Sequence, residues 1–170
     1  MRQPTLEKME MRLALIACAL ALNTSAALAA GTHSGGHGHE AMMVGESGKV
    51  AEVSRTIEIA MVEKGDGSMV FEPALLSVTE GETIRFVVKN AGEIEHEFVL
   101  DHHEKMMEHK ALMEKFPEME HDDPNAIRLA ENADGEVIWK FSNAGEFEFG
   151  CLIPGHYEAG MKGSITVAAN

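Results

Sequence analysis

The sequence predicts an all-β domain, an antiparallel sandwich or barrel, that carries one short helical insertion. From about residue 50 onward, apolar and polar residues alternate in short runs, which is the pattern of half-buried strands. Turns rich in Gly and Asn separate these runs, and this spacing favours a sandwich or barrel over a parallel α/β fold. One longer stretch, residues 101–117, lacks the alternation and is the expected helix.

Residues 1–30 are expected to be a secretory signal peptide. A positively charged start precedes an apolar run at 13–22, and Ala27-Leu-Ala29 supplies a small-x-small cleavage signal. The run is too short to span a membrane. We therefore expect cleavage after Ala29 or Ala30, a periplasmic location and no membrane insertion of the mature chain.

The two cysteines of the chain have different expected fates. Leu15-Ile-Ala-Cys18 resembles a lipoprotein cleavage box, which would give a lipid-anchored protein, but the apolar run continues past Cys18. We favour a plain signal peptide in which Cys18 is a small apolar residue. The mature chain then keeps one cysteine, Cys151. A lone thiol in an exported protein indicates a reactive thiol, an intermolecular bridge or a metal ligand.

Residues 31–49 are predicted to be a flexible tail, because they are rich in Gly, His and Ser. The domain proper is expected at 50–170. Its first half contains four expected strands, at 57–61, 75–78, 84–88 and 94–100. In the last of these, His96 shares the inward face with apolar residues, where a lone histidine is usually a satisfied core residue.

The second half begins with the helix and ends in further strands. Asp101, followed by Glu104 three residues later, is the expected helix N-cap, and Pro117 is expected to stop the helix. Short strands are then expected near 127–129, 137–141, 147–151 and 165–167. The strand at 147–151 places the thiol of Cys151 at the end of an inward-facing row.

A cluster of soft ligands follows at Cys151-x4-His156-x4-Met161. Thiolate, imidazole and thioether suit copper far better than magnesium or calcium. A type 1 copper site needs two histidines, one cysteine and a weak axial ligand that is usually Met, and His96 supplies the second histidine. Such a set serves both Cu(I) and Cu(II). Because His and Cys bind metal in their deprotonated forms, acid should weaken the site.

At this point the chain resembles the cupredoxin (blue copper) family over residues 50–170. The resemblance implies a Greek-key β-sandwich with one type 1 copper, whose equatorial ligands would be His96, Cys151 and His156 and whose axial ligand would be Met161. The Met/His-rich helical insertion and the His-rich tail make the chain most similar to the periplasmic copper-tolerance cupredoxins (CopI type), which are linked to resistance to excess copper. The residues that carry the likeness are Asn90, His96, Gly145, Phe147, Phe149, Cys151, His156, Met161, Gly163, Ile165 and Val167.

One residue departs from the family pattern. Many blue copper proteins have Asn or Ser directly after the first histidine, hydrogen-bonded across to the cysteine loop, whereas this chain has Glu97. A carboxylate cannot donate such a bond unless it is protonated. The hydrogen bonding around the sulfur affects colour and potential, so the sequence does not predict blue over green.

Two further groups of soft side chains are candidate ligands for additional copper ions. The expected helix carries four of them at i, i+4, i+7 and i+11, close to one face. The alternatives are a polar linker in the tail and a helix whose methionines pack on the sheet; both interpretations stay open. The tail candidates are His33, His37, His39, Met42 and Met43, and the helix candidates are His102, Met106, His109 and Met113, with His103, Met107, Met119 and His121 nearby.

The favoured function is copper handling and tolerance in the periplasm, with copper binding and transfer of one electron. The alternative is a dedicated electron carrier, similar to azurin or plastocyanin, for a respiratory redox partner. An enzyme is not expected, because the sequence shows neither an open coordination position nor a substrate pocket. A formal net charge of −14 argues against nucleic acid as a partner. The partner expected for a copper-handling protein is a redox or copper-trafficking protein.

Overall fold

The computed structural model describes residues 44–117 and 123–170. These residues form ten strands, a short 3-10 turn at Val50–Glu52 and one α-helix. Within them, no helix is long and apolar enough to cross a membrane. The elements are β1 (Glu46–Ser47), β2 (Arg55–Glu63), β3 (Met69–Glu72), β4 (Leu75–Thr79), β5 (Thr83–Asn90), β6 (His96–Asp101), α1 (His103–Lys115), β7 (Ala126–Leu129), β8 (Asp134–Lys140), β9 (Gly145–Gly150) and β10 (Lys162–Ala168).

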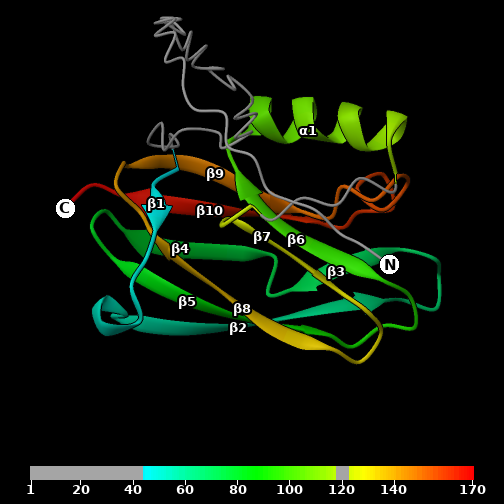
Figure 1. The fold of residues 1–170 in the computed structure, drawn as a ribbon, viewed down its shortest axis with the longest axis horizontal. Coiled ribbons are helices and arrows are strands. Elements are labelled where there is room, and N and C mark those ends of the chain that lie inside the picture. The colour runs from blue at the N-terminus through cyan, green and yellow to red at the C-terminus, as the bar shows by residue number, and fades with distance from the viewer. Residues whose placement is uncertain (1–43, 118–122) are drawn as a thin grey trace, which may run out of the picture. The chain divides into compact units, whose positions relative to one another are not determined.

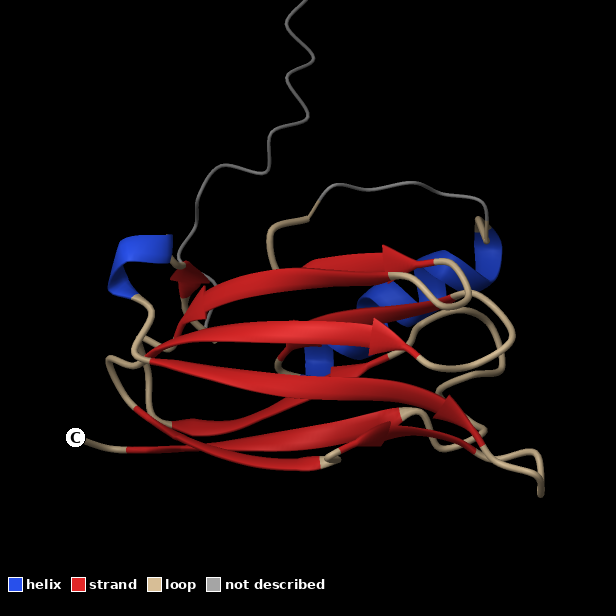
Figure 2. Cartoon of the chain, turned by 90° about the horizontal axis from the view of Figure 1, so that it is seen from below, coloured by secondary structure: helices blue, strands red, loops and turns tan. Residues whose placement is uncertain are grey.

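The strands form two five-stranded sheets that face each other as a sandwich (Figures 1 and 2). One sheet has the order β1-β8-β5-β2-β3 and the other has the order β4-β10-β9-β6-β7. The all-β sandwich expected from the sequence is therefore confirmed. Two neighbouring pairs, β2 with β5 and β4 with β10, run parallel rather than antiparallel, because the strands of each pair are joined through the other sheet instead of by a hairpin.

Aromatic side chains fill the space between the sheets. The ring centroids of Phe98 (β6) and Phe149 (β9) lie 5.4 Å apart with the rings tilted. Phe71 of β3 contacts Phe149 edge-on, with the centroids 5.1 Å apart. Trp139 and Phe86 from the facing sheet are also fully buried. This core supports β6, which begins at His96, and β9, which ends directly before Cys151.

The ordered domain begins earlier than the boundary expected at residue 50. Val44 is fully buried, and its carbonyl accepts a hydrogen bond from Trp139 Nε1–H at 3.2 Å. Strand β1 then pairs with β8, with Glu46 opposite Lys140. Residues 44–49 therefore belong to the sandwich and not to a tail. The rest of the expected tail, and Met119 and His121, lie outside the described residues.

Other local expectations need smaller corrections. The helix begins one residue later than expected, because its N-cap position is His102, while Asp101 Oδ1 accepts the His102 N–H at 2.8 Å. The strand expected at 94–100 begins two residues later, because Ile94 precedes β6 and is 43% exposed. The sequence also did not indicate β3, which is only four residues long.

Candidate metal centre

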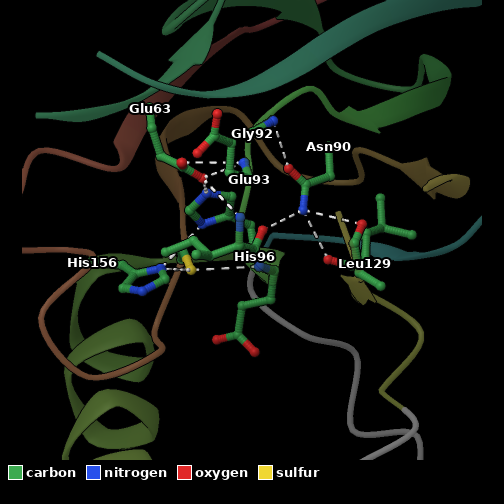
Figure 3. Close-up of polar contacts among 11 residues, drawn as sticks. Glu63, Asn90, Gly92, Glu93, His96, Leu129 and His156 are labelled. Carbon is green, nitrogen blue, oxygen red and sulfur yellow. Dashed lines mark hydrogen bonds and ion pairs between the residues drawn. The ribbon is translucent and has the colours of Figure 1, made fainter. Parts of the chain in front are cut away.

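Three candidate ligand side chains, those of His96, Cys151 and His156, lie close together, and Figure 3 labels the two histidines. His96 is the first residue of β6, Cys151 directly follows β9, and His156 lies in the loop between β9 and β10. The Nδ1 atoms of His96 and His156 are 3.1 Å apart, and Cys151 Sγ is 3.3 Å from His156 Nδ1. The three ligand atoms lie within 4.8 Å of one another, so a single ion can contact all of them.

Backbone hydrogen bonds close the loop that carries Cys151 and His156. The Cys151 N–H donates to the carbonyl of Met161 at 3.0 Å, and the Met161 N–H donates to the carbonyl of His156 at 3.1 Å. Gly160, with φ of +105°, takes a left-handed conformation that glycine adopts without strain. The loop therefore has a defined shape, and Met161, whose side chain is fully buried, is tied to both neighbouring soft-ligand residues.

Burial controls the protonation of the thiol. Cys151 is fully buried, and desolvation raises its pKa to about 12, although the Glu97 N–H, which donates to Sγ at 3.4 Å, works in the opposite direction. Without a cation the thiol therefore keeps its proton at neutral pH. A metal ion has to displace that proton, so binding is coupled to proton release.

The surroundings of His156 favour its neutral imidazole form. Burial lowers the pKa of His156, and the nearby His96 lowers it further. A neutral ring keeps a lone pair for a metal ion at neutral pH, whereas a protonated ring has none.

Glu63, at the end of β2, contacts the first histidine from outside the cluster. His96 Nε2 lies 2.8 Å from Glu63 Oε1, and the backbone N–H groups of Glu93 and Ile94 also donate to this carboxylate. Desolvation alone would raise the pKa of Glu63, but these hydrogen bonds together lower it. The side chain is therefore a carboxylate at neutral pH. Sequence reasoning missed Glu63, because nothing local connects β2 with a residue 33 positions later.

Glu97 makes the cross-connection that the sequence placed in doubt. Its carboxylate Oε1 accepts the N–H of Leu152 at 2.8 Å, and its side chain is only 2% exposed. The departure from the family pattern therefore keeps a cross-connection, with the side chain as the acceptor. The loop presents a backbone N–H at this position, which needs an acceptor, and a carboxylate supplies one.

The donor set fits copper. Two imidazole nitrogens and a thiol, all buried, match the His₂Cys set of type 1 copper sites, and hard cations such as magnesium prefer oxygen. The family model described as copper binding proteins of the plastocyanin/azurin family matches residues 58–168. The chain belongs to this family.

Relatives and solved structures agree with this family assignment. Over 163 residues, this chain is 44% identical to the copper-resistant cuproprotein CopI of Rubrivivax gelatinosus, and the match covers 92% of this chain and 96% of that protein. The CopI of Pseudomonas aeruginosa is 34% identical over 152 residues, covering 72% and 81%. The dithionite-reduced auracyanin of Roseiflexus castenholzii matches with a TM-score of 0.57 at 26% identity, covering 68% and 98%. The resemblance to CopI-type cupredoxins is therefore confirmed.

Two of the helix candidates for a second copper site pack in the core, and copper binding by the helix stays a prediction. Met106 and Met113 are fully buried in a cluster with Val99, Leu152 and Tyr157, so they pack the helix on the sheet. His102 is the N-cap residue, and His109 is half-buried. Among the described His, Cys, Asp and Glu residues, only the group of His96, Cys151 and His156 brings three ligand atoms close enough to share an ion.

Proposed function

We propose that this cupredoxin is a periplasmic copper-handling protein that protects the cell from excess copper. The observation that carries the proposal is the buried His96–Cys151–His156 group in a chain 44% identical to a copper-resistant cuproprotein. We propose that these three residues, together with Met161, would hold the copper ion. Bound copper would supply one-electron Cu(I)/Cu(II) chemistry. The partner would be a redox or copper-trafficking protein.

The chain's own residues perform three tasks in this function. The sandwich holds His96 on β6, and the hydrogen-bonded loop holds Cys151 and His156 within reach of it. Burial excludes water from the thiolate. The ligand atoms lie within 4.8 Å of one another, so these residues would hold the ion with little rearrangement between Cu(I) and Cu(II).

A dedicated electron carrier is the second candidate, and the fold shared with auracyanin favours it. A deletion strain separates the two roles. Poor growth of the strain in high copper supports copper handling. Loss of a respiratory activity at ordinary copper, with normal growth in high copper, would make the carrier role the correct one.

The copper centre itself is tested by spectroscopy. Wild-type protein loaded with Cu(II) is expected to show an intense visible thiolate-to-copper band, and Cys151→Ala should abolish it, because the band requires the sulfur ligand. Ser142→Ala serves as the control, since residue 142 lies in the exposed turn between β8 and β9 and should leave the band unchanged. A colourless wild-type protein would refute the type 1 centre.

A further inference from the structure

Glu63 is hydrogen-bonded to the loop that precedes His96. It ends β2, and its carboxylate reaches across to residues that follow β5 (Figure 3). Oε1 accepts the N–H of Glu93 at 3.0 Å and the N–H of Ile94 at 3.2 Å, in addition to its 2.8 Å contact with His96 Nε2. Two donors of the chain therefore fix the carboxylate independently of the histidine.

The opposite side of the same loop is held by Asn90. Its Nδ2 donates to the carbonyls of Ile94 at 2.7 Å and of Leu129 at 3.0 Å, and its Oδ1 accepts the Gly92 N–H at 2.9 Å. A side chain at Gly92 would collide with the Glu63 carboxylate, so glycine leaves the space that this carboxylate occupies. These contacts fix the positions of the loop, the Glu63 carboxylate and the His96 ring relative to one another.

This arrangement determines which nitrogen of His96 is available. A carboxylate only accepts hydrogen bonds, so His96 Nε2 must carry the proton and donate it to Glu63. The lone pair is then on Nδ1, the atom that lies 3.1 Å from His156 Nδ1. A metal-binding histidine whose other nitrogen donates to a carboxylate is fixed in orientation and becomes a more basic ligand.

We propose that Glu63 is a positioning residue that holds the Nδ1 lone pair of His96 toward the copper site and favours Cu(II) over Cu(I) there. The negative charge and the more basic imidazole both stabilise the more highly charged ion. The inference rests on the proposed copper centre. It deepens the proposed function, because a site that favours Cu(II) makes bound Cu(I) a better one-electron donor to a redox partner.

The test replaces the charge and keeps the shape. In the copper-loaded protein, Glu63→Gln is expected to raise the ratio of Cu(I) affinity to Cu(II) affinity about tenfold, seen in voltammetry as a rise of about 59 mV for a one-electron couple. The visible thiolate band should shift but persist. Glu93→Gln is the matched control: it removes the same charge from an exposed side chain on the same loop and should change the potential far less, because solvent screens exposed charges.

A second measurement needs no bound copper. Nitrogen NMR of His96 in copper-free wild-type protein is expected to show the Nε2–H tautomer, and Glu63→Gln should give a mixture of tautomers. An Nδ1–H tautomer in the wild type, or equal potentials in wild type and Glu63→Gln, would overturn the proposal. If the wild type shows its visible band, either of these outcomes rejects only the role of Glu63 and not the copper centre. A wild type without the band refutes the centre itself.

Discussion

Glu97 contacts the cysteine loop through both its backbone and its side chain. The backbone N–H donates to Cys151 Sγ, and the carboxylate accepts the N–H of Leu152. The sequence identified this residue as a departure from the family pattern, but it could not tell whether the facing group was a donor or an acceptor. That depends on the path of the loop in three dimensions. The ligand candidates could be proposed from their spacing and chemistry in the sequence, and the structure brings His96, Cys151 and His156 together. The hydrogen bonds around them leave no pattern in the sequence.

The role of this carboxylate gives a prediction at the scale of one residue. Glu97→Ala leaves the buried Leu152 N–H without an acceptor and should lower the unfolding free energy by about 1–3 kcal/mol. Glu97→Gln keeps an acceptor oxygen in the same place and should lose clearly less. Urea unfolding of the copper-free proteins measures both. Equal losses in the two variants would show that the charge of Glu97, and not its acceptor oxygen, stabilises the loop.

At the scale of elements, helix α1 packs against the loop between β9 and β10, which carries Cys151 and His156. Met106 and Met113 pack against Leu152 and Tyr157, which directly follow Cys151 and His156 in the chain. Lys110 strengthens this contact, since its Nζ lies 2.6 Å from Glu158 Oε1 of the loop and 2.7 Å from Glu114 Oε1 of the helix. The sequence predicted the helix but not the role of its methionines, because a thioether can fill a core as well as bind copper.

The packing role of α1 has a measurable consequence. Met106→Ala and Met113→Ala should each lower the unfolding free energy by about 2–5 kcal/mol, because each leaves a cavity under the helix. Leu112→Ala, on the exposed side of the same helix, should cost much less. Copper bound per chain, counted by metal analysis, should be unchanged in all three. Loss of a copper equivalent in Met106→Ala or Met113→Ala would restore the second copper site on the helix.

At the scale of the whole molecule, the alternation of apolar and polar residues predicted most strands and the sandwich. It did not predict which strands become neighbours: β2 pairs in parallel with β5, and β4 pairs with β10 from the far end of the chain. Such pairings depend on the packing of the whole core and leave no local pattern. Strand β1 was missed for a similar reason, since two residues are too few to show a period of two.

The start of the domain therefore lies within the segment expected to be a tail, and paired deletions in the mature protein can locate it. Removing residues 31–43 keeps Val44 and β1 and should leave the unfolding free energy nearly unchanged. Removing residues 31–48 takes away the buried Val44 side chain and the carbonyl that accepts Trp139 Nε1–H. We expect this to cost about 1.5–3 kcal/mol for the side chain, and more for the unpaired indole N–H.

Metal analysis of the same two proteins tests the copper candidates in the tail, because the shorter deletion removes His33, His37, His39, Met42 and Met43 together. If these side chains bind copper, the full mature chain should hold more than one copper and the 31–43 deletion should hold one, with its visible band intact. One copper in both proteins would make the tail a polar linker. Because the shorter deletion leaves the described fold complete, a change in copper count there is not a consequence of unfolding.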